Sequence, residues 1–330
     1  MAYVTSSMAS TVQGLAPARP DERPAAPPTA TPPAASAAPG VRLTYALLVL
    51  MALIWGVNFS VLKVGTRHFA PLTLNGLRLA LAATVLGVLA AVRRRHLPSR
   101  GDAVRLVLLG VLGHGLYQVL FIEGVAHATA STAALVMAAG PAFIGIVGRL
   151  LGVERPSRAA WAGIGLQLAG MAGVVSGSAT QRAAPGQDGG LLGPALVLAA
   201  ALTWACYAVL LKPFAARVDG LQLSAWTLFG GVAVLLPAAA PGVARLDWGA
   251  VAPAGWGAVL YSALLAMVTA YLFYYRGVRV VGPVRTSMFS NLQPIVALGV
   301  AAATLGERPG PLQLAGAALI AAGLVVAARR

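Results

Sequence analysis

The chain has 330 residues, of which 58% are hydrophobic and only 10% are charged, and its formal net charge is +15. An ordinary soluble domain carries about 25% charged residues, so this composition excludes a soluble fold and indicates a chain surrounded mostly by lipid. The positive charge does not indicate nucleic-acid binding, because the arginines stand in short clusters between apolar runs rather than on one basic face.

Residues 1–41 differ from the rest of the chain, because they are rich in Pro, Ala and Thr and carry few large apolar side chains. Such a segment cannot bury a core, and we expect a disordered cytoplasmic tail. It lacks the apolar stretch of a cleavable signal peptide, so we expect none.

Ten apolar segments follow, and their length of about 20 residues is that of a transmembrane helix. They lack the two-residue alternation of barrel strands, so the predicted fold class is an all-α integral membrane protein. Most connections are short and carry Pro, Gly or charge. The predicted helices span residues 43–63, 71–92, 103–124, 128–151, 158–178, 190–212, 220–240, 253–276, 282–305 and 311–328.

The first and sixth segments share a pattern around the only two lysines of the chain. WGVNFSVLK ends at Lys63 and WACYAVLLK ends at Lys212, and each begins with a Trp eight residues earlier. Further matches follow at an offset of 153 residues, for example from Pro141 to Pro294. Several matches in one register indicate an internal duplication.

The duplication predicts two repeats of five helices each, at residues 42–180 and 190–328. Because five is odd, the second repeat starts on the opposite side of the membrane, and the two repeats are inverted. Inverted repeats can present two related gates around one midplane site, which is the usual basis of alternating access. With the N-terminus inside, eighteen Lys and Arg residues fall on the inner side and five on the outer side. The positive-inside rule then predicts a protein of the cytoplasmic membrane with both termini in the cytoplasm.

The stretch GVAHATASTAALVMAAGPAFIGIVGRLLGVERPSRAAWAGIGLQLAGMAGVV resembles the second part of an EamA repeat, with a mid-helix Pro, a Glu-Arg pair and a Gly-spaced last helix. IWGVNFSVLKVG and NGLRLALAA resemble the first part, including Arg78 of helix two. The resemblance covers roughly residues 43–328. It implies the drug/metabolite transporter superfamily, ten helices, and a central cavity lined mainly by helices one to four and six to nine. Thr227 replaces the counterpart of Arg78, so an Arg-dependent contact would exist in one half only.

The third predicted helix carries the densest set of polar side chains, namely His114, Tyr117, Gln118 and Glu123. His114 and Gln118 are four residues apart and therefore share a face of an α-helix, with Tyr117 beside them. Polar side chains inside a membrane are costly and mark functional sites, so we predict that this face lines a substrate cavity. The alternative is hydrogen bonding to neighbouring helices that only stabilises the bundle.

His114 and Glu123 are also the candidates for proton coupling. A histidine can bind and release a proton near neutral pH, and Glu123 is the one acidic residue inside a predicted helix. The alternatives are a neutral, hydrogen-bonded histidine and an interfacial glutamate.

The ninth predicted helix carries Ser287, Asn291 and Pro294 at spacings that put them on one face. Pro294 and Pro141, its counterpart in helix four, each remove a backbone hydrogen bond. We predict two kinks that flank the transport pathway; the alternative is kinks that only fit the packing. The matching face of helix four carries alanines, so the cavity should be polar on one side and apolar on the other.

Polar and aromatic residues of helices one, six and eight complete the predicted cavity: Trp55, Asn58, Trp204, Tyr207, Tyr271 and Tyr274. The alternative for the aromatic residues is an interfacial anchor. We predict interfacial charges at Lys63 and Lys212. Arg78 either snorkels outward or holds an anionic partner, and we include it in the cavity.

Helices five and ten are crowded with Gly and Ala, which allow close helix packing or, alternatively, a homodimer face.

The leading function is a secondary transporter that moves small metabolites, with amino acids and efflux implied by the resemblance. The partners expected are a small-molecule substrate and the lipid bilayer, without nucleic acid, metal or cofactor. No Walker, H-E-x-x-H or G-x-S-x-G motif is present. A membrane-embedded enzyme and a passive channel are the alternatives.

Overall fold

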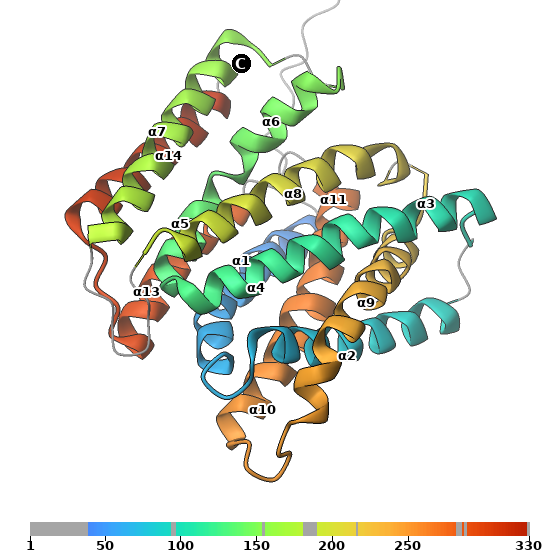
Figure 1. Cartoon of the computed structure of the whole chain (residues 1–330). Coiled ribbons are helices and arrows are strands. Elements are labelled where there is room, and N and C mark those ends of the chain that lie inside the picture. The colour runs from blue at the N-terminus through green and yellow to red at the C-terminus, as the bar shows by residue number, and fades with distance from the viewer. Residues whose placement is uncertain are drawn as a thin grey trace, which may run out of the picture. The chain divides into compact units, whose positions relative to one another are not determined.

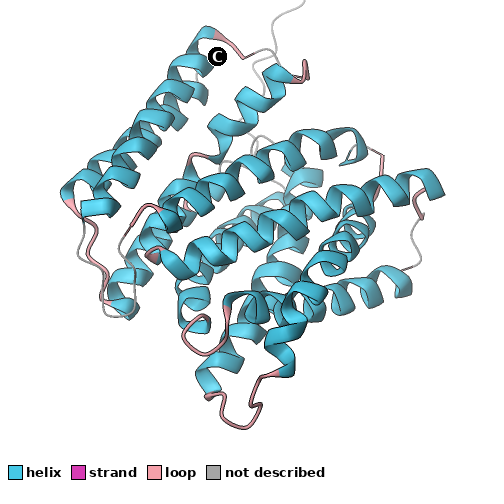
Figure 2. Cartoon of the chain, in the orientation of Figure 1, coloured by secondary structure: helices cyan, strands magenta, loops and turns pink. Residues whose placement is uncertain are grey.

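The structure is a computed structural model that describes residues 39–93, 97–153, 156–180, 190–215, 217–281, 286 and 289–328. Every regular element among these residues is helical (Figure 2). Most of the predicted tail lies outside the described residues. Helix α1 begins at Pro39, where a proline fits the first helical turn.

The helices follow one another with short connections (Figure 1). Those of the first repeat are α1 (Pro39–Gly65), α2 (Pro71–Val92), α3 (Arg100–Gly110), η1 (Val111–Leu116), α4 (Tyr117–His127), α5 (Ala130–Ala138), α6 (Gly140–Leu150) and α7 (Arg158–Thr180). Those of the second repeat are α8 (Leu192–Ala215), α9 (Gly220–Ala244), α10 (Pro253–Leu260), η2 (Tyr261–Thr269), α11 (Ala270–Val281), α13 (Gln293–Leu305) and α14 (Pro311–Ala328).

Eight helical stretches in the described part of the chain are long and apolar enough to cross a membrane. They correspond to the first eight predicted segments and include two long stretches, Arg100–His127 and Pro253–Val281, that each join three elements. Two shorter apolar helices, Gln293–Leu305 and Pro311–Ala327, correspond to the ninth and tenth predicted segments.

Both predicted proline kinks are full breaks between helices. The segment predicted as one helix over 128–151 is divided at Ala139, and α6 begins beside Pro141. In the second repeat α13 begins at Gln293 with Pro294 in its first turn. A proline cannot donate to the preceding turn and its ring clashes there, whereas it fits the start of a new helix.

Two of the long helices contain a π-helical section at corresponding places. The section η1 spans residues 111–116, which map onto 264–269 at the offset of 153, inside η2. Such wide turns occur often at functional sites, and they change which side chains share a helix face. The chain therefore carries matched irregularities in its two repeats.

The glycines of α7 and α14 pack against each other, and the two helices lie side by side (Figure 1). A Cβ atom on Gly163 would lie 2.5 Å from the carbonyl oxygen of Gly323, and one on Gly170 would lie 2.5 Å from that of Gly316. One number rises as the other falls, so the helices are antiparallel. These glycines allow two helices of the same chain to pack closely, which is what the packing interpretation predicts.

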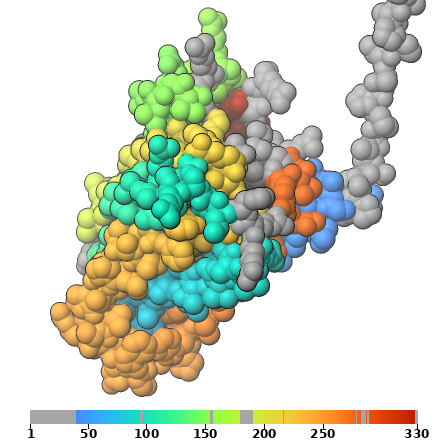
Figure 3. Space-filling view, turned by 90° about the vertical axis from the view of Figure 1, so that its right-hand side faces the viewer, coloured from blue at the N-terminus to red at the C-terminus, as the bar shows by residue number. Residues whose placement is uncertain are grey.

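A charged contact joins α3 to the turn between α8 and α9. Helix α3 packs against α8 and α9, as the space-filling view also shows (Figure 3). The Arg217 guanidinium, in the turn between α8 and α9, donates to the Asp102 carboxylate of α3 at 2.8 Å. Arg217 is half exposed, so this pair contributes little to stability.

The glycine contact predicts a contrast between two alanine substitutions on α7. Gly170→Ala should lower the free energy of unfolding by roughly 1–3 kcal/mol, because the added methyl group overlaps the backbone of α14. Gly165→Ala is the matched control, since a Cβ atom there meets nothing within 4 Å. Thermal unfolding of both variants in detergent micelles measures the difference, and equal stability of the two variants would contradict the close packing.

Candidate functional site

A cavity of about 280 Å³ lies between helices of both repeats. Its volume is close to the lower end of the range of about 300–1,000 Å³ for small-molecule pockets. The residues around it come from α1, α2, α4, α5, α6, α8, η2, α11, α13 and the segment just before α13. Side chains far apart in the sequence therefore meet around one cavity.

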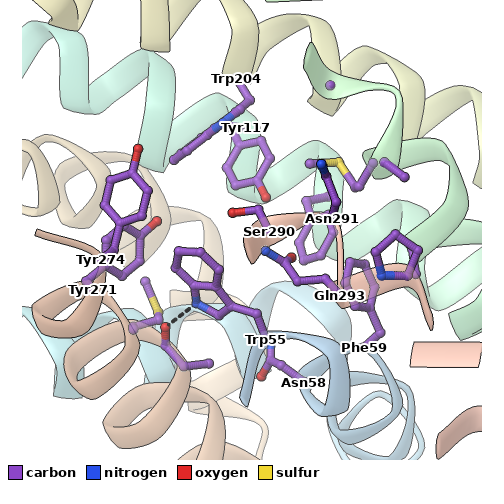
Figure 4. A pocket seen from close by; sticks show the side chains of 18 of the residues that line it. Trp55, Asn58, Phe59, Tyr117, Trp204, Tyr271, Tyr274, Ser290, Asn291 and Gln293 are labelled. Atoms are coloured by element: carbon purple, nitrogen blue, oxygen red, sulfur yellow. Dashed lines mark hydrogen bonds between the residues drawn. The ribbon is translucent and has the colours of Figure 1, made fainter. Parts of the chain in front are cut away.

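Aromatic rings form a large part of the cavity wall (Figure 4). The Trp55 ring lies 5.5 Å from that of Tyr271 and 6.0 Å from that of Tyr274, measured between ring centroids. The Tyr117 ring lies 5.1 Å from that of Trp204. The Trp55 indole donates a hydrogen bond of 2.8 Å to the carbonyl of Ala266 in η2, which fixes its orientation.

Polar side chains interrupt this apolar wall at defined places. The Arg78 guanidinium of α2 is only 3% exposed, and its Nη2 donates to the Gln118 side-chain oxygen at 3.2 Å. Its Nε and Nη1 have no hydrogen-bond partner among the described residues. The same holds for the side-chain oxygen of Asn58. Buried polar atoms without partners are rare, so these atoms are candidates for binding a ligand.

The two proline segments face the cavity with different chemistry. The wall from α5 and α6 is apolar: Ala134, Met137, Ala138, Gly140, Pro141 and Ile144. The wall before and at the start of α13 is polar: Ser290, Asn291, Gln293 and Pro294. Figure 4 shows the three polar side chains of the second wall beside Trp55. This is the polarity difference that the sequence predicts.

Many lining residues are counterparts of one another in the two repeats. At the offset of 153 residues the pairs are Gln118 with Tyr271, Phe121 with Tyr274, Met137 with Ser290, Ala138 with Asn291, Gly140 with Gln293, and Pro141 with Pro294. At the offset of 149 residues Trp55 matches Trp204. The duplication thus supplies the positions of the cavity wall, and later divergence supplies its chemistry.

Two residues predicted to line the cavity lie behind its wall instead. His114 is buried with its ring beside those of Trp204 and Tyr271, and its Nε2 lies 3.4 Å from the Tyr207 hydroxyl. His114 lies in the π-helical section η1 and Gln118 in α4, and of the two only Gln118 lines the cavity. Tyr207 packs its ring directly onto Gly113 of η1, which has no side chain to occupy that space.

Two further predicted residues remain, of which the structure describes one. Glu123 of α4 is half-buried near the end of its helix and does not line the cavity. Its backbone carbonyl contacts His127 Nδ1 at 2.8 Å. Ser287 lies outside the described residues.

The structure corrects the position of Lys63, for which the sequence predicts an interfacial charge. The residue is only 5% exposed, and its Nζ donates to the carbonyls of Val125, Ala126 and Ala128 at 3.1, 2.7 and 2.7 Å. These carbonyls end α4, where the helix dipole is negative. Lys63 therefore caps a neighbouring helix instead of facing the lipid headgroups.

Glu307 binds the helix that starts just after this cap. Its two carboxylate oxygens accept from the backbone amides of Ala130 and Ser131 at 2.8 and 2.9 Å, and one also accepts from the Ser131 hydroxyl at 2.6 Å. These amides open α5, where a negative charge is favoured. Lys63 and Glu307 thus bind the two sides of the two-residue turn between α4 and α5. Glu307 comes from the second repeat, so its contacts with α5 also join the two repeats.

The fold is that of a multi-pass membrane protein with an internal cavity, and comparisons with known proteins identify it further. The chain belongs to the EamA-like transporter family, whose profile matches residues 42–176 and 191–329. The resemblance seen in the sequence is therefore confirmed, including the drug/metabolite transporter superfamily.

The relatives are bacterial proteins of similar length. A "probable terminal-alkyne amino-acid exporter" of Streptantibioticus cattleyicolor is 32% identical, covering 86% of this chain and 92% of the relative. A "probable amino-acid metabolite efflux pump" of Salmonella typhimurium is 31% identical, covering 85% and 93%. A crystal structure with 21% identity superimposes with a TM-score of 0.59 over 85% of this chain and 96% of that chain, which supports the fold.

The buried cap predicts that Lys63→Met destabilises the protein. The substitution leaves three carbonyls without a donor and removes a charge from the end of α4, so the free energy of unfolding should fall by roughly 1–3 kcal/mol. Arg67→Met is the matched control, because Arg67 is an exposed cation at the same end of α1. Chemical or thermal unfolding in micelles compares the two, and an equal loss in both variants would reject the capping role.

Proposed function

We propose that this protein is a secondary transporter that exports small amino-acid-type metabolites across the cytoplasmic membrane. The observation that carries the proposal is the cavity, because both repeats line it at corresponding positions with aromatic and polar side chains. The printed names of two relatives, an amino-acid exporter and an amino-acid metabolite efflux pump, favour the same substrate class and direction.

The proposed architecture is ten transmembrane helices in two inverted repeats, at residues 42–180 and 190–328. The antiparallel glycine contact of α7 with α14, the matched proline breaks and the matched π-helical sections support it. Each of these features relates a residue of one repeat to its counterpart in the other. An inverted arrangement lets the two halves exchange conformations around the central cavity, which is alternating access.

Lys63 and Glu307 each bind the turn between α4 and α5, and these contacts fit a closed gate at one end of the cavity. The rings of Phe59 and Phe121 contact each other and belong to a buried apolar cluster, which fills the bundle toward the end of α1. The capped turn between α4 and α5 lies beyond it. With the N-terminus in the cytoplasm, as the arginine distribution favours, this end faces outward, and the protein is closed to the outside.

A counterflow experiment tests the transporter function. Purified protein is placed in liposomes preloaded with an unlabelled amino acid, and entry of the labelled form is followed, with protein-free liposomes as the control. We expect transient accumulation above equilibrium, because a carrier exchanges bound substrates across the membrane. Equilibration without accumulation would identify a channel, and the absence of any entry across a broad panel of amino acids, organic cations and nucleosides would reopen the membrane-enzyme alternative.

Proton coupling is a separate proposal, and His114 is its better-supported candidate. Its ring contacts Trp204 and Tyr271 of the cavity wall, and the titratable groups facing it are the hydroxyls of Tyr207 and Tyr271. Glu123 lies farther from the cavity, near the end of α4.

The expected result is that a pH gradient increases uptake by the wild type and by Glu123→Gln, whereas uptake by His114→Ala falls to the level without a gradient. Counterflow without a gradient should persist in His114→Ala, which separates coupling from binding. Full gradient dependence in both variants would remove the proton proposal.

A homodimer also stays a prediction, and the molecular mass in micelles by light scattering tests it.

A further inference from the structure

The positive charge of Arg78 is buried in the protein without a counter-ion among the described residues. Its guanidinium is buried at the cavity wall, and within the described structure its one hydrogen bond goes to a neutral amide, Gln118. Nε and Nη1 are left without partners. A guanidinium stays protonated in proteins, so the charge cannot be removed by releasing a proton.

Two acidic residues of the described structure already have partners. Glu307 binds the start of α5, and Asp102 pairs with Arg217. Neither forms an ion pair with Arg78, and none of the described cavity-lining residues is an Asp or Glu. A buried charge without a counter-ion is strongly unfavourable, so a negatively charged group entering the cavity would gain a large electrostatic interaction.

We propose that Arg78 is the binding site for the carboxylate of the substrate. This inference deepens the proposed function and rests on it. Nη2 gives one of its two hydrogens to Gln118, and its other N–H runs parallel to an N–H of Nη1 or to that of Nε, both of which lack partners. The guanidinium therefore keeps a pair of parallel donors that match the two oxygens of a carboxylate, the geometry for which arginine is best suited. The aromatic wall around Trp55, Tyr117 and Trp204 receives the apolar part of the same molecule. The substrate class is therefore a small monocarboxylate with an apolar side chain.

The inference also says which part of an amino acid the cavity does not require. The described lining contains no acidic side chain to pair with an ammonium group, and offers neutral acceptors such as the free oxygen of Asn58. A free carboxylate is needed, whereas a free amine is not. N-acylated amino acids should bind as well as the parent compounds, and amides of the carboxyl group should not.

The position also occurs only once in the two repeats. Thr227 stands at the counterpart of Arg78, and its hydroxyl donates to the carbonyls of Leu223 and Ser224 within its own helix. The second repeat therefore supplies no second cation at that place. One guanidinium holds one carboxylate, which gives the substrate a single orientation in an otherwise repeated cavity.

Binding of matched compounds to the purified full-length protein tests the inference. The probes are leucine and phenylalanine, each as the free acid, the carboxamide and the N-acetyl acid, measured by displacement of the labelled parent acid and by the ligand-induced shift of the unfolding temperature. For the wild type we expect the acid and its N-acetyl form to bind within a few-fold of each other. The carboxamide should bind at least about ten-fold more weakly.

Three variants separate a binding role from a structural one. Arg78→Gln should lose the preference for the acid, and Arg78→Lys should restore part of it, because the charge returns without the paired donors. Gln118→Glu places a carboxylate beside Arg78 within the protein. This variant should keep or raise the unfolding temperature and yet bind the acids at least about ten-fold more weakly, since the guanidinium is already occupied.

The outcomes distinguish this inference from the proposed function. Equal binding of acid and carboxamide by the wild type, an unchanged preference in Arg78→Gln, or wild-type affinity for acids in Gln118→Glu would each overturn the role of Arg78. Counterflow of the carboxamides would leave the transporter function standing while this inference fails. If no probe binds the wild type or enters by counterflow, the proposed amino-acid substrate class falls and the carboxylate site falls with it.

Discussion

The structure depends on one constraint: the backbone groups at a buried helix end must find partners within the protein. The turn between α4 and α5 shows how the chain meets it. Lys63 supplies three hydrogen bonds to the carbonyls at one helix end, and Glu307 binds the amides at the start of the next. Each charge is placed where a helix dipole favours it. Glu307 comes from the second repeat and α5 from the first, so these contacts of Glu307 also join the two repeats.

The interruptions of the helices shape the cavity in the same way. Pro141 and Pro294 lie in the first turn of new helices at corresponding places, and the residues beside both of them line the cavity. Duplication accounts for the geometry, since it puts a break and a wall at the same position twice. The chemistry of the walls then differs by substitution alone, as Ala138 faces the cavity from one repeat and Asn291 from the other. A repeated frame thus carries an asymmetric site.

The sequence predicts much of this arrangement, and its failures have specific physical causes. Segment length and composition locate the long helices, and the rarity of polar groups in lipid points to Asn58, Gln118 and Asn291. His114 lies behind the cavity wall against Tyr207 of α8, and the sequence could not show this, because the contact depends on how α8 packs against η1. The partners of Lys63 could not be read either, since a contact to a turn 62 residues away depends on how whole helices pack.

Arg78 and Lys63 show why a buried cation has to be interpreted from its surroundings and not from its type. Both are almost fully buried, but Lys63 has three protein acceptors, whereas Arg78 has one neutral partner and two free donors. A satisfied charge stabilises one arrangement of the helices. An unsatisfied charge leaves part of its interaction energy for a ligand, and a ligand can shift a conformational equilibrium only by the difference in its affinity for the two states. In the proposed transporter, a carboxylate at Arg78 would supply such a difference, because it completes an ion pair that the empty cavity lacks.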